Sequence, residues 1–227
     1  VPTFTIAPGA SVCSNTDVTY TTQPGQSNYI WTVPGTLGTD YTITSGGIGS
    51  ANNTVTLKWL TSGNKTVTVN YITGSCSGLV PASNTTNVNL RPTAIITSAD
   101  IDICDPGNAT ISGTVTANGA WTVTLSDGTT ATGNGNGTFT IPVSPTSTTI
   151  YTISSLYDAN CTATPADLTG STKVTVNQPV TITTQPEDQT ICANTVSVDF
   201  AVEATGTISS YLWYKNGVAM SDGGDVS

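Results

Sequence analysis

Apolar and polar side chains alternate along most of this sequence. In one segment Val55, Leu57 and Trp59 alternate with threonine and lysine. The same period of two recurs at 29–33, 67–71, 121–125, 139–143 and 196–202. This alternation predicts β-strands with one buried face, and no stretch carries a helical period. Threonine fills 47 of the 227 positions, and on the outward face its branched Cβ suits a pleated surface.

Two residue types recur along the chain with one period. The first is a cysteine before a strand, at Cys13, Cys104 and Cys192. The second is a tryptophan on the following strand, at Trp31, Trp121 and Trp213. The cysteines are 91 and 88 residues apart and the tryptophans 90 and 92. Two markers with one period predict tandem copies of one unit. With prolines at the junctions, we place the domains at 1–91, 92–178 and 179–227.

The third segment has 49 residues, about half a repeat, and is predicted to be the first half of a truncated sandwich. Its inner face would carry Val198, Phe200 and Trp213. Exposing such a face costs about 25 cal/mol per Å² of apolar surface. We therefore expect a continuation of the chain or a neighbouring molecule to cover it.

Composition excludes several classes of function. Charged residues make up 8% of the chain and the net charge is −9, which argues against binding to nucleic acid or to anionic membrane surfaces. No apolar run is long enough for membrane insertion. The chain contains no histidine, and its carboxylates are scattered without a nucleophile or base beside them. We predict that the protein is not an enzyme and uses no cofactor or metal.

Two constellations allow an alternative interpretation. Asp100, Asp102 and Asp105 form the densest acidic group. Their oxygens are of the kind that binds calcium, although the spacing is not that of an EF-hand, so the sequence leaves calcium binding open. The three repeated tryptophans could form a sugar-stacking row. Their constant offset from a cysteine, on strands with alternating neighbours, favours the interpretation that Trp31, Trp121 and Trp213 are core anchors.

About seven short strands in ninety residues, with a cysteine before one strand and a tryptophan on the next, predict an all-β fold of tandem immunoglobulin-like (PKD-like) β-sandwich domains. Three stretches, 121–128, 157–161 and 184–217, resemble the Ig-like and PKD-like repeats of secreted Bacteroidota surface proteins. The resemblance implies a non-catalytic stalk segment of a bacterial cell-surface adhesin. Such arrays are similar to the large mobile gliding adhesin of flavobacteria, which is exported by type IX secretion.

The resemblance also bears on location and partners. It implies an extracellular protein whose partners are the neighbouring repeats of a longer chain, surface glycans or the secretion machinery. The alternative is a carbohydrate-binding or accessory module of a secreted polysaccharide-degrading enzyme. An exposed aromatic row, or a catalytic domain elsewhere in the full chain, would distinguish that alternative from a stalk.

Five widely spaced cysteines in a chain without histidine indicate disulfides of an extracellular protein. Cys13 lies just before a strand and Cys76 just after the strand at 67–71. In an Ig-like sandwich these turns lie at opposite poles, about 26 Å apart, whereas a disulfide needs Cα atoms within about 7 Å. We therefore expect Cys13 to bond Cys161 across the junction at Arg91-Pro92. A swapped strand order would restore bridges within each unit, and that alternative stays open.

The same rule extends to the remaining cysteines. Cys104 would await a turn cysteine of the third unit, Cys192 one of a fourth unit, and Cys76 a cysteine of a preceding unit. This arrangement accounts for the odd number of cysteines.

Overall fold

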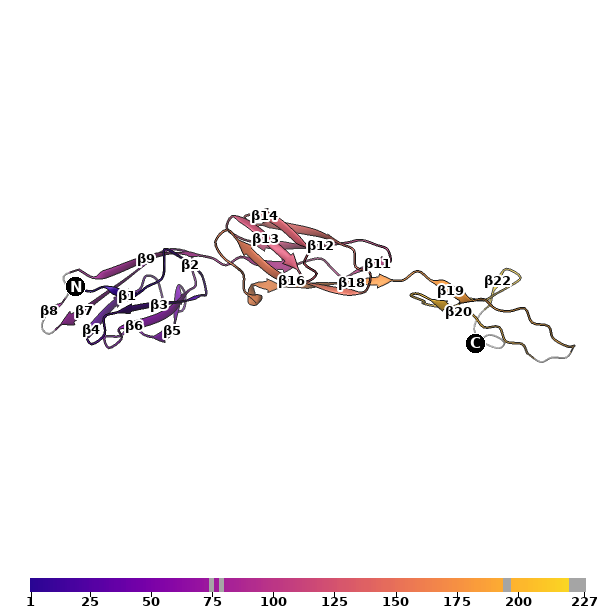
Figure 1. Cartoon of the computed structure of the whole chain (residues 1–227), viewed down its shortest axis with the longest axis horizontal. Helices are drawn as coiled ribbons and strands as arrows, with labels where there is room; N and C mark the ends of the chain where they lie inside the picture. Colours follow the sequence, from indigo (N-terminus) through magenta and orange to yellow (C-terminus); the bar gives the residue numbers. More distant parts are fainter. Residues whose placement is uncertain (74–75, 78–79, 194–196, 221–227) are drawn as a thin grey trace. The chain divides into compact units, whose positions relative to one another are not determined.

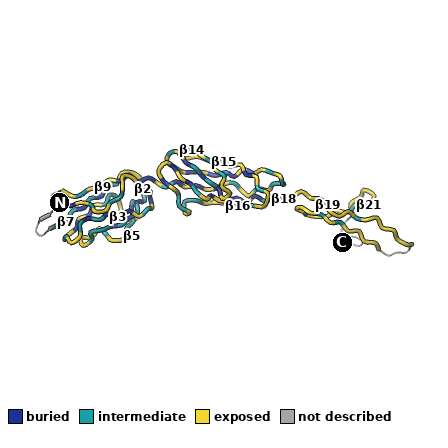
Figure 2. Tube along the Cα trace, in the orientation of Figure 1, coloured by how far each residue is buried: buried dark blue, intermediate teal, exposed yellow. Residues whose placement is uncertain are grey.

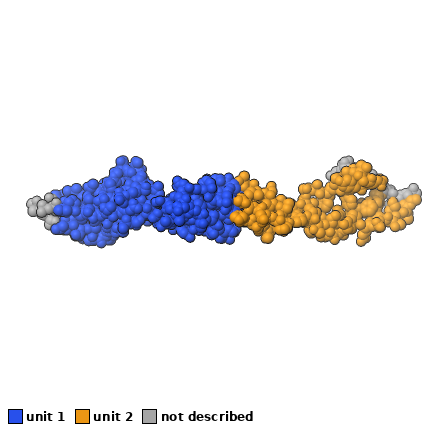
Figure 3. Space-filling view, turned by 90° about the horizontal axis from the view of Figure 1, so that it is seen from above, with its two compact units in different colours: residues 1–98, 111–141, 151–172 blue, residues 99–110, 142–150, 173–227 orange. Residues whose placement is uncertain are grey.

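The computed structural model describes residues 1–73, 76–77, 80–193 and 197–220 (Figure 1). Within these ranges the ordered elements are β-strands and one short 3₁₀ helix, η1 (Pro165–Asp167), and no helix there is long and apolar enough to cross a membrane. The chain divides into two compact units (Figure 3). The first contains residues 1–98, 111–141 and 151–172, and the second contains 99–110, 142–150 and 173–227. The domain boundaries inferred from the repeat stay a prediction.

Residues 1–91 form two packed sheets whose strands are mostly antiparallel. One has the strand order β1 (Phe4–Ile6), β3 (Asp17–Thr22), β6 (Thr54–Trp59), β5 (Tyr41–Gly46). The other has the order β2 (Ser11–Cys13), β9 (Ala82–Asn89), β7 (Gly63–Thr73), β4 (Ser27–Thr32), and β8 (Cys76–Ser77) pairs with β7. Side chains from both sheets share one apolar core.

The predicted alternation places this core. Val55, Leu57 and Trp59 on β6 are all fully buried, and the Trp59 ring packs edge-on against Tyr41 with 5.7 Å between centroids. Threonines on the other face pair across strands, as Thr19 Oγ1 does with Thr56 Oγ1 at 2.9 Å. Such cross-strand pairs stabilise a sheet whose outer face is polar.

Residues 92–178 contain two further sheets. The first has the order β15 (Gly137–Val143), β12 (Ala109–Thr116), β10 (Thr93–Ile96), β17 (Leu168–Thr169). The second has the order β11 (Ile101–Cys104), β18 (Ser171–Asn177), β16 (Thr149–Asp158), β13 (Ala120–Leu125), β14 (Thr130–Asn134). Alternate residues are buried again, as at Trp121, Val123 and Leu125 on β13. The all-β prediction of tandem Ig-like sandwiches is confirmed.

Glycine permits the close packing around Trp121. Its register partner across β13 and β14 is Gly133, and a Cβ at Gly133 would collide with the indole ring. The absence of a side chain at Gly133 allows the ring to pack directly against the neighbouring strand.

The described part of residues 179–220 contains two short hairpins. In one, β19 (Thr181–Thr184) pairs with β20 (Glu203–Thr205), and in the other, β21 (Tyr214–Lys215) pairs with β22 (Val218–Ala219). The strand predicted at 196–202 is wrong for residues 197–202, which are irregular, and Val196 lies outside the described residues. The alternation at these residues is that of a strand with one buried face. A lone hairpin without a second sheet to bury that face is only marginally stable in water.

Burial follows the same division. Dark blue segments run through the sheets of residues 1–178, whereas residues 179–193 and 197–220 are half-buried or exposed (Figure 2). Val198 is 37% exposed and Phe200 52% exposed, so the described residues do not bury the side chains expected on the inner face of the third segment. Its expected cover stays a prediction. Trp31 and Trp121 are buried as predicted for core anchors, but Trp213 is only half-buried.

Candidate functional site: the disulfide-linked joint

Strand β2 holds Cys13 beside the end of β9. The two strands run parallel, with Cys13 in register with Asn89, and the Ser14 N–H donates to the Asn89 carbonyl oxygen at 2.8 Å. Cys13 therefore lies next to the point where the chain leaves the first sandwich, immediately before Arg91 and Pro92.

The turn after β16 holds Cys161, and Asp158 shapes that turn. Its Oδ1 accepts the N–H groups of Asn160 at 2.8 Å and of Cys161 at 2.7 Å, and its Oδ2 accepts that of Asn118 at 3.0 Å. The Asp158 N–H closes the turn by donating to the Cys161 carbonyl at 2.9 Å. An aspartate side chain that accepts hydrogen bonds from the backbone N–H groups two and three residues later is typical of a tight turn. Within this turn Cys161 is only 4% exposed.

A disulfide joins these two positions. Cys13 and Cys161 are separated by 148 positions in the sequence, but their Cα atoms lie 5.8 Å apart. This distance is within the ordinary range for disulfides. This is the pair expected from the poles of an Ig-like sandwich. In the chain-entropy description, closing a loop of this length lowers the conformational entropy of the unfolded chain and so stabilises the folded state by about 5 kcal/mol.

Arg91 adds a polar clamp to the covalent link. Its Nε donates to the Ser14 carbonyl at 2.8 Å and its Nη2 to Thr16 Oγ1 at 2.8 Å. Its Nη1 donates to the Thr162 carbonyl, next to Cys161, at 2.7 Å. The planar guanidinium can serve three acceptors at once, which a lysine ammonium on its flexible stem does not reproduce.

Sequence reasoning identified Arg91 only as a junction residue. Two of its acceptors are backbone carbonyls, which have no signature in the sequence. The only available signal was that Arg91 is the single arginine of the chain and precedes a junction proline. A shallow hollow surrounds the joint, lined by Val12, Thr16, Tyr157 and Ala159 among others.

The other cysteines lie elsewhere. Cys104 ends β11, is exposed, and forms no disulfide within the described residues. Cys192 is exposed as well. Cys76 belongs to β8, and its side chain lies outside the described part of the chain.

The acidic group is not gathered into a site. Asp100 Oδ1 accepts the Lys173 N–H at 2.8 Å, which ties the residue before β11 to the neighbouring strand β18. Across the described ranges, no three His, Cys, Asp or Glu side chains come together as a set of metal ligands. The geometry therefore adds no support for calcium at Asp100, Asp102 and Asp105.

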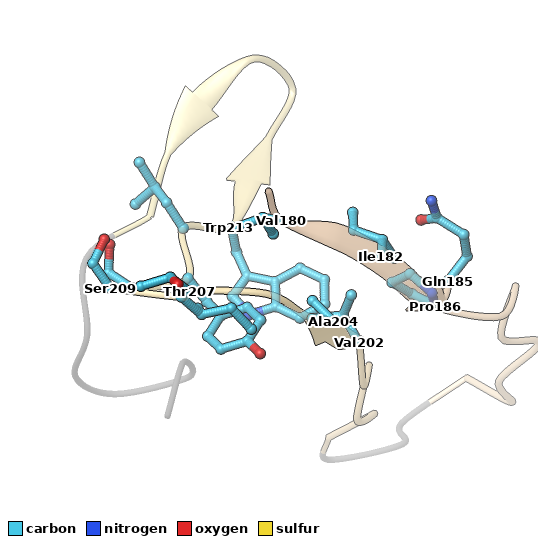
Figure 4. Close-up of a pocket in the computed structure, with 13 residues that line it drawn as sticks. Val180, Ile182, Gln185, Pro186, Val202, Ala204, Thr207, Ser209 and Trp213 are labelled. Carbon is cyan, nitrogen blue, oxygen red and sulfur yellow. The ribbon is translucent and has the colours of Figure 1, made fainter. Parts of the chain in front are cut away.

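The second compact unit contains an apolar groove. Figure 4 shows the indole of Trp213 in a hollow that Val180, Ile182, Val202 and Ala204 also line. The groove follows from the open third segment, because a sandwich buries such residues beneath its second sheet.

The sequence matches no known protein family and no characterised protein. Solved structures with tandem domains resemble it. The eight N-terminal Ig domains of Down Syndrome Cell Adhesion Molecule align with a TM-score of 0.51 and 12% identity, over 99% of this chain and 30% of that chain. An I-band fragment of titin gives 0.47 and 14%, over 98% of this chain and 82% of that chain.

The Escherichia coli adhesin FdeC gives a TM-score of 0.37 and 13% identity, over 78% of this chain and 63% of that chain. At 12% identity the likeness to the Down Syndrome Cell Adhesion Molecule shows the fold alone, which is that of tandem Ig-like domains.

Proposed function

We propose that this chain is a structural stalk segment of a secreted bacterial cell-surface adhesin, without catalytic activity, which positions a distal binding region. The observation that carries the proposal is the joint at Arg91. There a disulfide and an arginine clamp add to a connection of only three residues, because β9 ends at Asn89 and β10 begins at Thr93.

The proposed role is mechanical, because the joint restrains movement of one sandwich relative to the next. The backbone connection and the Cys13–Cys161 bond are two tethers, and two tethers leave only rotation about the line through them. The hydrogen bond from Arg91 to Thr162 opposes that remaining rotation. A spacer needs this restraint, because each free hinge would let the distal region fold back toward the cell.

Chemistry supports an extracellular location. Disulfides persist outside the cell and are rare in reducing compartments. Only 8% of residues are charged, and hydroxyl-rich strands give a hydrated, weakly charged surface. The resemblance to Bacteroidota repeats extends the proposal to an adhesin that serves surface attachment or gliding motility and leaves the cell by type IX secretion.

The carbohydrate-binding alternative requires aromatic rings open to a sugar. Trp31 and Trp121 are buried, and their indole N–H groups donate to the carbonyls of Asn52 and Gly135, each at 2.8 Å. Rings held in this way are core anchors, so these two tryptophans favour the stalk over a stacking platform. Retardation of the chain in affinity electrophoresis through soluble glycans would favour the alternative.

The stalk function is tested by freeing the joint. We expect the variant with Cys13→Ser, Cys161→Ser and Arg91→Gln to show a broader distribution of radius of gyration in small-angle X-ray scattering than the unmodified chain. Cys104→Ser, which removes a cysteine outside this joint, is the control and should leave the distribution unchanged. Identical distributions for the triple variant and the unmodified chain would contradict the mechanical role.

A further inference from the structure

The joint after residue 177 repeats the backbone geometry of the first joint. In the first, parallel strands β2 and β9 place Cys13 in register with Asn89, whose carbonyl accepts the N–H of the residue after the cysteine at 2.8 Å. In the second, parallel strands β11 and β18 place Cys104 in register with Asn177. The Asn177 carbonyl accepts the Asp105 N–H at 2.9 Å.

The two cysteines therefore occupy equivalent positions, but only one is bonded. Cys13 is joined to Cys161, whereas Cys104 is exposed and outside any disulfide within the described residues. We propose that Cys104 is one half of a second joint disulfide. Its partner is a cysteine in the turn after the long strand of an adjacent Ig-like sandwich, the position that Cys161 takes opposite Cys13.

Gln178, the residue that follows β18, supports a second joint with the same arrangement as the first. Gln178 Nε2 donates to the Thr146 carbonyl at 3.3 Å. The Gln178 N–H donates to Thr207 Oγ1 at 2.7 Å, and its carbonyl accepts the Thr207 N–H at 2.9 Å. One linker residue thus holds both a loop before it and a hairpin after it, as Arg91 does in the first joint.

The groove around Trp213 points to the same partner. Trp31 and Trp121, its counterparts in the repeat, each bond a carbonyl on a later segment of their own sandwich, at Asn52 and Gly135. The hairpins of residues 179–220 present Val180, Ile182 and Trp213 around an open groove instead. The strands that would complete this sandwich are the ones that carry the turn cysteine, so one partner covers the groove and meets Cys104.

The bond forms by thiol–disulfide exchange. The Cys104 thiolate attacks a small-molecule disulfide such as oxidised glutathione, which releases one reduced thiol and leaves a mixed disulfide on Cys104. The partner thiolate then attacks Cys104 Sγ and expels the second small thiol. One disulfide bond has formed and one has been broken, and the two electrons and two protons reside on the released thiols.

The test uses the protein as its own cells display it. The protein is extracted without reductant, its free thiols are blocked with iodoacetamide, and it is digested before aspartates. Cleavage at Asp17, Asp40, Asp100, Asp102, Asp105, Asp158, Asp167, Asp188 and Asp199 separates the five cysteines onto five peptides. We expect peptide 102–104 to be linked to a cysteine peptide from an interstrand turn of an Ig-like sandwich, and the peptide ending at Thr16 to be linked to 158–166.

Several outcomes would overturn the proposal. They are a carbamidomethylated Cys104, a glutathionylated Cys104, and a bond from Cys104 to Cys192 or to another Cys104. In the purified 227-residue chain, iodoacetamide should modify Cys104 within about tenfold of its rate in the denatured chain, and Cys104→Ser should remove that signal. A protected thiol would also count against the proposal. The proposal extends the stalk function to a second joint, and its failure leaves the scattering test of the first joint intact.

Discussion

Arg91 and Thr162 lie 71 residues apart in sequence, yet the Arg91 Nη1 donates to the Thr162 carbonyl at 2.7 Å. The same guanidinium donates to the Ser14 carbonyl. One side chain from the connection therefore binds the strand end that carries Cys13 and the turn that carries Cys161. The polar clamp and the disulfide therefore act on the same two segments.

Arg91→Gln should weaken the joint measurably. A hydrogen bond from a charged donor contributes about 1.5–3 kcal/mol, and the glutamine amide cannot reach all three acceptors. We expect the free energy of unfolding in urea to fall by about 1–3 kcal/mol. Lys215→Gln removes an equal charge from the exposed Lys215 and should have no effect. Equal stability of the two variants would contradict the clamp.

Asp158→Asn should loosen the turn around Cys161. The carboxylate accepts three backbone N–H groups, whereas an asparagine offers one acceptor oxygen and turns its own N–H₂ toward donors. We expect faster reduction of the Cys13–Cys161 bond by dithiothreitol and a stability loss of about 1–3 kcal/mol. The exposed Asp199 is the matched position, and Asp199→Asn should leave the reduction rate unchanged.

Gly133→Ala should disturb Trp121. A Cβ at Gly133 would meet the indole ring directly, so the ring or the strand must shift. We expect a loss of about 1–3 kcal/mol and altered tryptophan fluorescence. Gly137→Ala is the control, since a Cβ there has no neighbour within 4 Å. If the two alanine variants behave alike, Trp121 is not packed as described.

Tyr20 should make the fold sensitive to alkali. Burial raises the pKa of Tyr20 above its usual value, although interaction with Trp59 opposes the shift. The folded state then holds the phenol proton more tightly than the unfolded chain does. Its stabilising contribution is complete below pH about 10 and is lost as pH rises through the folded-state pKa.

Urea titrations at several alkaline pH values test this dependence. Tyr20→Phe should flatten the decline of unfolding free energy above pH about 10. Tyr214→Phe, at a residue that is 63% exposed, should retain the decline. An unchanged slope in the Tyr20 variant would assign the alkaline loss to other groups.

The local alternation of apolar and polar residues was sufficient to predict the buried strand faces of the sandwiches. Val55, Leu57 and Trp59 are buried because alternate residues of a strand face the same way, a property of the backbone that the sequence records directly. The spacing likewise predicted three buried anchors, at Trp31, Trp121 and Trp213. The first two are buried, whereas Trp213 is half-buried. The same logic failed at residues 197–202, since alternation specifies which face is apolar but not whether a second sheet is present to bury it.

The sequence by itself determined the alternating buried strands of residues 1–178 and, through the poles of an Ig-like sandwich, the expectation that Cys13 meets Cys161. Only the tertiary structure decided how Arg91 and Asp158 serve the joint. Arg91 binds the carbonyls of Ser14 and Thr162, and Asp158 binds the backbone of Asn118. Every residue carries a backbone carbonyl and every residue but proline an N–H, so such partners leave no mark in the sequence. They become specific only when the folded strands bring distant segments to one place.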